Sequence, residues 1–209
     1  WVVLPLAALL AGGFGVLLGA PTLRLRGDYL AIVTLGFGEI VRIFINNLNA
    51  PINITNGPQG ISQIDPVRIA GVPLSKTLEV FGLSFPSVYL YYYLFLALVV
   101  ASVIICHRLE LSRVGRAWMA IREDEDVAEA LGINLIQTKL LAYMLGAAFA
   151  GLGGAIFTVL VGSIFATSMQ LIVSINVVSL IIVGGMGCVP GVIVGAIALI
   201  GLPELLREV

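Results

Sequence analysis

Charged residues are the scarcest feature of this chain. They make up 11% of its 209 residues, while 59% of the residues are hydrophobic. A soluble domain carries about 25% charged residues, so this deficit excludes an ordinary globular core and predicts an integral membrane protein. The formal net charge of −1 and the lack of a basic stripe argue against a nucleic-acid partner.

Histidine and cysteine are also nearly absent. His107 is the only histidine, which leaves little material for a histidine-based metal site or a Ser-His-Asp triad. Cys106 and Cys188 lie far apart inside apolar segments, and we expect buried small hydrophobes rather than a disulfide. The glycine cluster at residues 184–187 lacks the Gly-Lys-Ser/Thr ending of a phosphate loop, so we expect a turn between two short helices. The sequence therefore predicts no enzyme chemistry, no metal and no cofactor in this chain.

Hydrophobic windows of about 20 residues, the length that crosses a bilayer, recur along the sequence. They predict one all-α domain over residues 1–209, a polytopic integral membrane helix bundle with five or six spans. The third span opens with tyrosines 89, 91, 92 and 93, which are typical of an interfacial aromatic belt. Because the chain starts at Trp1 rather than Met, we expect a fragment of a longer protein. The spans are expected at residues 1–20, 29–48, 87–106, 140–165, 171–187 and 189–202. The last two are short, and a partial or buried helix is the alternative for residues 189–202.

Lysine and arginine are distributed unevenly among the predicted loops. Arg24 and Arg26 follow the first span, and five more basic residues lie in a polar island at residues 107–139. The loop at residues 49–86 holds only two. The positive-inside rule assigns the basic loops to the cytoplasm, so residues 49–86 are expected to be external.

The polar island is the one segment with dense charge, and it is expected to be helical. Asp124 or Asp126 is expected to cap a helix, and Gly132 is expected to stop it. Two interpretations stay open from spacing alone: a solvated cytoplasmic loop, or a helix that docks on a second protein. An apolar stripe at helical spacing is formed by Ala120, Ile121, Val127, Ala128 and Leu131, and the small alanines at 128 and 130 would allow close approach of a partner.

Polar residues within predicted spans are costly and usually paired or functional. Glu39 and Arg42 are spaced i,i+3 and are expected to form a mutual ion pair. Contact with a zwitterionic solute and a position near the external mouth are the alternatives. Ser174 and Asn176 are expected to hydrogen-bond across helices or to line a solute path. A close helix crossing is predicted from the small residues Gly146, Ala147, Ala150, Gly151 and Gly154.

Eight stretches carry a family resemblance, among them GDYLAIVTLGFGEIVR at residues 27–42 and TNGPQGI at residues 55–61. The others are the polar island, through Arg116 and residues 120–125 and 128–134, and residues 139–142, 150–154, 184–187, 190–191 and 202–207. Together they resemble the permease subunits of ATP-binding cassette (ABC) importers for branched-chain amino acids, the LivM-like group. The resemblance covers nearly the whole chain, and the family permease is longer at both ends.

The resemblance implies that the island contains the coupling helix, which sits in a groove of an ATP-binding subunit. The residues that would couple to this subunit are Arg116, Ala120, Ile121, Arg122, Glu123, Asp124, Glu125, Ala128, Glu129, Ala130, Leu131 and Gly132. A translocation path is expected near Thr34, Phe37, Glu39, Arg42, Ser174 and Asn176.

The implied function is import of branched-chain or related neutral amino acids across a bacterial or archaeal inner membrane, by alternating access driven by ATP on other subunits. The implied partners are ATP-binding cassette subunits, a second permease subunit and a periplasmic or lipid-anchored solute-binding protein, besides the lipid bilayer. From the residues alone, two other classes stay open. One is an ion-gradient-driven secondary carrier or channel with Glu39 and Arg42 as its coupling pair, and the other is a non-transporting membrane scaffold.

Overall fold

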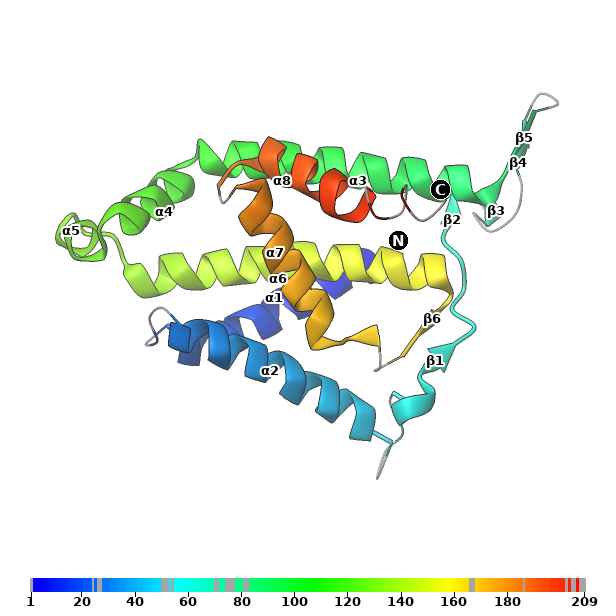
Figure 1. Ribbon diagram of the computed structural model, residues 1–209, viewed down its shortest axis with the longest axis horizontal. Helices are drawn as coiled ribbons and strands as arrows, with labels where there is room; N and C mark the ends of the chain where they lie inside the picture. The colour runs from blue at the N-terminus through cyan, green and yellow to red at the C-terminus, as the bar shows by residue number, and fades with distance from the viewer. Residues whose placement is uncertain are drawn as a thin grey trace. The chain divides into compact units, whose positions relative to one another are not determined.

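Helices dominate the computed structural model, which confirms the predicted all-α membrane bundle (Figure 1). The chain divides into unit 1, Trp1–Ala31 with Gly60–Ile164, and unit 2, Ile32–Gln59 with Phe165–Val209. Arg24 and Arg26, which contribute to the predicted orientation, lie outside the described residues. The structure describes residues 2–23, 25, 28–49, 53, 55–69, 72–73, 78–80, 83–165, 168–185, 187–201, 203 and 206.

Unit 1 is built on three long helices: α1 (Val3–Thr22), α3 (Ser87–Glu110) and α6 (Leu135–Val161). All three are long and apolar enough to cross a membrane, because 20 helical residues extend about 30 Å. Two short helices, α4 (Arg113–Glu123) and α5 (Glu125–Ala130), connect α3 to α6. Figure 1 shows them at the end of unit 1 where α3 ends and α6 begins.

Small residues bring α1 and α6 into close antiparallel contact. A Cβ atom on Gly15 would lie 2.6 Å from the Cβ of Ala147, and one on Gly151 would lie 2.6 Å from the Cβ of Ala11. Higher numbers on α1 meet lower numbers on α6, so the helices run in opposite directions. The predicted close crossing is therefore confirmed for residues 147 and 151, and its partner is α1. A Cβ atom on Gly146 or Gly154 would meet no atom within 4 Å, so these two glycines are not part of this crossing.

The opposite end of unit 1 carries short antiparallel strand pairs. β1 (Ile61–Ser62) pairs with β6 (Ser163–Ile164), with Ile61 opposite Ile164. β2 (Arg68–Ile69) pairs with β3 (Val72–Pro73), and β4 (Leu78–Val80) pairs with β5 (Leu83–Phe85). Among its described residues, the segment that the sequence predicted to be rich in turns thus contains two such pairs, and its strand β1 pairs with β6 just after the end of α6.

Tyr91 departs from the predicted aromatic belt. Its side chain is only 6% exposed, and it lines a pocket together with Ile64 and Val159. Tyr89, Tyr92 and Tyr93 are exposed, as an interfacial belt requires. Successive residues on a helix point in directions about 100° apart, so one of four neighbouring tyrosines faces the interior.

Unit 2 contains most of α2 (Asp28–Asn47), the 3-10 turn η1 (Gly57–Gln59), α7 (Leu171–Gly184), α8 (Val189–Ala196) and the π-helical η3 (Ile197–Gly201). Gly185 and Gly187 have φ angles of +94° and +87°, which L-residues with a Cβ rarely adopt. These glycines reverse the chain between α7 and α8. The predicted turn between two short helices is confirmed.

The motif TNGPQGI closes the C-terminal end of α2. The Thr55 hydroxyl donates a hydrogen bond to the carbonyl oxygen of Ile45 at 2.7 Å, which satisfies an acceptor left free at a helix end. Gly57 has a φ of +53°, and a Cβ atom there would lie 2.9 Å from the carbonyl oxygen of Asn46. Only glycine permits this approach.

Two helix boundaries and both cysteines differ from the predictions. α3 continues to Glu110, because His107 and Arg108 in its last turn suit the negative end of the helix dipole. α6 begins at Leu135 instead of residue 140, because Asn134 caps it and its polar first turns are still helical. Cys106 is half-buried and Cys188 is exposed, so neither is a fully buried small hydrophobe. Cys106 lines a pocket together with Leu145 and Phe149 of α6.

Candidate coupling site

The turn from α3 into α4 depends on Ser112 and Gly115. The Ser112 hydroxyl donates to the carbonyl oxygen of Leu109 at 2.6 Å and accepts the backbone N–H of Gly115 at 3.2 Å. This is the cap expected of a serine at a helix N-terminus. A Cβ atom on Gly115 would lie 2.2 Å from the carbonyl oxygen of Glu110, so glycine is required for α4 to fold back tightly on α3.

Asp124 breaks the polar island into two helices. Its backbone is extended, with φ −156° and ψ 118°, and its Oδ1 accepts the N–H groups of Asp126 and Val127 at 2.9 and 3.1 Å. The prediction that Asp124 or Asp126 caps a helix is confirmed for Asp124. The prediction of a single continuous apolar stripe is wrong, because Asp124 both ends α4 and caps the start of α5.

α5 ends in a glycine turn. The backbone N–H of Gly132 donates to the carbonyl oxygen of Glu129 at 2.9 Å, and that of Ile133 donates to Ala128 at 3.1 Å. Gly132 has a φ of +85°. This pair of bonds is the Schellman arrangement that commonly terminates helices. The predicted helix stop at Gly132 is confirmed.

The exposed face of α5 differs from the predicted stripe. Ala128 is 1% exposed and Ile121 is 9% exposed, so both pack inward. Val127 and Leu131 are 54% and 74% exposed, and Ala130 is exposed beside them. The small residue that a partner could approach closely is therefore Ala130, while Ala128 is already covered by this chain.

Charged side chains surround that apolar face. Arg116, Arg122, Glu123, Asp124 and Glu129 are exposed, whereas Ala120 and Glu125 are half-buried. Glu125 and Asp126 occupy the first turn of α5, where negative charge favours the helix dipole. Among the residues that the structure describes, no group of three His, Cys, Asp or Glu side chains could hold a metal ion. The exposed side chains of Val127 and Leu131 thus lie among exposed charged residues.

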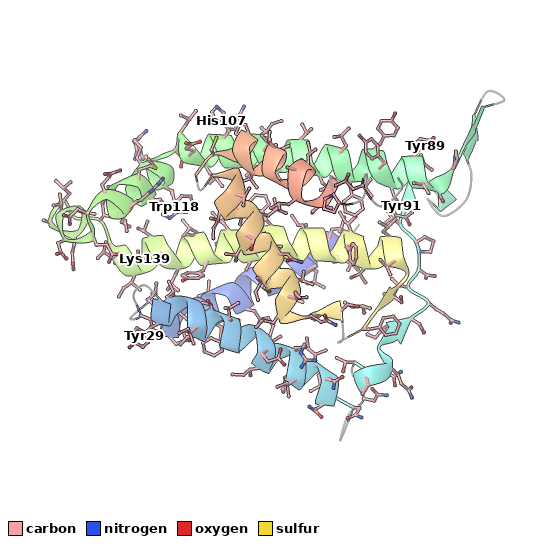
Figure 2. All side chains as sticks on the ribbon, viewed as in Figure 1. Tyr29, Tyr89, Tyr91, His107, Trp118 and Lys139 are labelled. Atoms are coloured by element: carbon pink, nitrogen blue, oxygen red, sulfur yellow. The ribbon has the colours of Figure 1, made fainter. Side chains whose placement is uncertain are left out.

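Two residues that the sequence did not single out as coupling residues join this site to α6. The indole Nε1 of Trp118 donates to the carbonyl oxygen of Thr138 at 2.8 Å, and Lys139 Nζ lies 2.7 Å from Glu125 Oε1. Trp118 and Lys139 are labelled in Figure 2 at the α4–α5 end of unit 1. They border a cavity of about 630 Å³ that Thr22 of α1 also lines. The sequence signal for this contact was a tryptophan inside a polar island. Its ring is apolar and its N–H needs an acceptor, so it is expected to pack against another element.

The predicted path residues are divided between two helices of unit 2. Thr34, Phe37, Glu39 and Arg42 lie on α2, and Ser174 and Asn176 lie on α7. α7 packs on α8, and in the described part of unit 2 it is not closely packed against α2. The structure therefore does not bring these six residues into one site.

Ser174 and Asn176 do not form the predicted bonds across helices. Both are exposed on α7, where almost every residue is apolar and exposed. No hydrogen bond of either side chain is present among the described residues. α7 is 14 residues long, and the glycines of α8 approach its backbone at Leu180 and Gly184, near its C-terminal end.

Glu39 and Arg42 form the predicted ion pair on one face of α2. Arg42 Nε donates to Glu39 Oε2 at 2.9 Å, and Arg42 Nη2 also donates to Oε1. The side chains of Arg42 and Glu39 are 30% and 37% exposed. The two charges therefore neutralise each other within one helix turn, the arrangement expected of ionisable residues in a membrane span.

Removing one partner of this ion pair should destabilise the protein more than removing both. We expect Glu39→Gln to lower the melting temperature in detergent, because it leaves Arg42 without its counter-charge. The double change Glu39→Gln with Arg42→Gln should recover most of that loss. Glu110→Gln serves as the control, because Glu110 lies 3.9 Å from His107 in an exposed pair. The single change Arg42→Gln completes the set. If the double variant loses as much melting temperature as Glu39→Gln and Arg42→Gln lose together, the two residues act independently.

Comparison with known proteins assigns this architecture to a family. A family model described as "Branched-chain amino acid transport system / permease component" matches residues 1–209. No solved structure matches the chain.

Curated relatives carry the same description. The chain is 44% identical to the high-affinity branched-chain amino acid transport system permease protein LivM of Escherichia coli (strain K12), over all of this chain and 51% of that protein. It is 27% identical to the probable branched-chain amino acid transport permease protein LivM of Methanocaldococcus jannaschii, over 98% of this chain and 56% of that protein. It is 31% identical to LivH of Escherichia coli (strain K12), over 46% of this chain and 31% of that protein. The chain thus spans about half the length of the LivM proteins that it matches. A match over its full length, on a bundle of apolar helices, places the chain in the permease component family of branched-chain amino acid transport systems.

Proposed function

We propose that this protein is the membrane-spanning permease subunit of an ATP-driven importer for branched-chain or related neutral amino acids. Membership of the permease family supports the transport role. The observation that carries the mechanism is α5, a six-residue helix capped at both ends, with Val127, Ala130 and Leu131 exposed. This helix would dock on an ATP-binding cassette subunit, and ATP binding and hydrolysis there would drive alternating access.

The two ends of unit 1 support an orientation in the membrane. Thr22, at the end of α1, lines the same cavity as Glu125 and Lys139, so the connection after α1 and the α4–α5 segment share one end. We place that end in the cytoplasm and residues 49–86 outside. The membrane would be the inner membrane of a bacterium or archaeon. The external side would receive solute from a periplasmic or lipid-anchored binding protein, and a second permease subunit would complete the path.

The solute path would pass along α2 and α7 of the complete permease. Thr34, Phe37, Glu39 and Arg42 on α2 would line one part of it. Ser174 and Asn176 on α7, which the described part of this chain does not pack closely against α2, would line another part. Because Glu39 and Arg42 are paired with each other, the path offers little net charge. Such a path suits a solute whose side chain is aliphatic.

Uptake by the full-length permease, reconstituted with its ATP-binding subunits and solute-binding protein, tests this function. We expect labelled leucine to accumulate in liposomes only when ATP is supplied on the side opposite to the solute. Accumulation should persist when ionophores collapse the proton and sodium gradients, and it should stop when the ATP-binding subunits are omitted. Uptake driven by an imposed ion gradient without ATP would contradict the proposal and establish a secondary carrier.

A further inference from the structure

The bend between α4 and α5 is attached to two consecutive residues of α6. Trp118 of α4 donates its indole N–H to the carbonyl oxygen of Thr138 at 2.8 Å. Glu125 of α5 forms an ion pair with Lys139, whose Nζ lies 2.7 Å from Glu125 Oε1. One attachment lies before the break at Asp124 and the other lies after it. Both α4 and α5 are therefore attached to the same turn of α6.

These attachments are partly shielded from water. The side chains of Lys139 and Glu125 are 28% and 35% exposed. Both line the cavity of about 630 Å³ that lies beside them. Partial burial strengthens an ion pair relative to one on an open surface. The pair is thus better suited to transmit a displacement than the exposed His107–Glu110 pair, whose atoms are 3.9 Å apart.

α6 passes the displacement to α1 one turn further along. A Cβ atom on Gly19 would lie 3.0 Å from the ring of Tyr143, and one on Gly15 would lie 2.8 Å from the Tyr143 carbonyl oxygen. Tyr143 also lines the cavity next to Lys139. Because closely packed helices move together rather than deform, α1 and α6 would follow the α4–α5 bend as one body.

We propose that the Trp118–Thr138 and Lys139–Glu125 contacts form a two-point staple that transmits docking at α5 to the α1–α6 pair. Trp118 and Lys139 are positioning residues, because neither belongs to the exposed docking face. This inference rests on the proposed function of α5 as the coupling helix. It adds the route by which movement of that helix reaches the membrane-spanning part of this chain.

The test uses the full-length permease complex and three variants: Lys139→Gln, Trp118→Phe, and the charge exchange Lys139→Glu with Glu125→Lys. We expect Lys139→Gln and Trp118→Phe to bind the ATP-binding subunit like the parent and to keep basal ATP hydrolysis. Their solute-stimulated ATP hydrolysis should fall by about fivefold or more, the range of a typical coupling free energy. The charge exchange should restore most of the stimulation, because it rebuilds the ion pair with the two charges reversed, and equal melting temperatures of Lys139→Gln and the parent would exclude simple destabilisation. Glu110→Gln is the matched control, because it removes a charge from the same end of unit 1 and should leave stimulation unchanged.

Several outcomes would overturn the staple. Parent-like stimulation in Lys139→Gln and Trp118→Phe would show that the contacts transmit nothing. Loss of subunit binding in these variants would make the residues part of the docking surface instead. If the charge-exchange variant shows as little solute stimulation as Lys139→Gln, the ion pair has no role in transmission. A parent complex that shows no solute stimulation at all would contradict the proposed function itself, and this result is distinguishable because it precedes any substitution.

Discussion

Ala130→Arg is expected to abolish solute-stimulated ATP hydrolysis in the full-length permease complex while the membrane helices remain folded. Ala130 is exposed at the last position of α5, so a longer side chain meets no atom of this chain's interior. An arginine there also suits the negative end of the helix dipole. In a close interface, however, the same arginine would be an unpaired charge, which costs about 2–5 kcal/mol of binding free energy. Association would weaken by about 30-fold or more.

The measurement is ATP hydrolysis with and without solute-loaded binding protein, together with co-purification of the ATP-binding subunit. Gln137→Arg provides the control, because Gln137 is exposed in the first turn of α6 and receives the same added charge outside the docking face. A normal melting temperature for Ala130→Arg would show that folding is intact. If this variant keeps both subunit binding and stimulation, α5 is not the docking element.

Gly151→Leu is expected to separate α1 from α6 and to lower the stability of unit 1. A Cβ atom at residue 151 would lie 2.6 Å from the Cβ of Ala11 and 2.9 Å from the carbonyl oxygen of Ala7. The second contact is with backbone, which cannot move without shifting α1. Overpacking of this kind costs about 1–3 kcal/mol, and each kcal/mol lowers Tm by about 2–4 °C in a domain of this size.

Gly154→Leu is the matched control for this prediction. Residue 154 lies one turn further along the same helix, and its Cβ would meet no atom within 4 Å. Thermal unfolding of both variants in the same detergent should show a loss for Gly151→Leu only. Equal melting temperatures for the two variants would contradict the close α1–α6 crossing.

The sequence predicted the features of this protein that depend on a few neighbouring residues. The cap at Asp124, the stop at Gly132 and the pair of Glu39 with Arg42 all join residues at most five positions apart. Such contacts follow from helix geometry, which is the same in every fold. The predicted docking role of this segment is not tested by its geometry and stays a prediction.

Contacts between distant segments could not be predicted in the same way. Trp118 meets Thr138 and Glu125 meets Lys139 only because α4 and α5 fold back on α6 at a particular angle. Likewise, the small residues of α6 predicted a close crossing without naming α1. Ala128 was misplaced because the apolar stripe treated residues 120–131 as one helix, whereas the break at Asp124 turns α5 relative to α4.

The α1–α6 crossing also sets a condition on biosynthesis. Roughly 110 residues separate the end of α1 from the beginning of α6, and ribosomes add about 5–20 residues per second. The alanine and glycine face of α1 is therefore without its partner helix α6 for on the order of ten seconds during synthesis. During that interval lipid or the insertion machinery must cover it. A nascent chain stalled before α6 would leave α1 without its packing partner, and this makes the crossing a late step in the assembly of the protein.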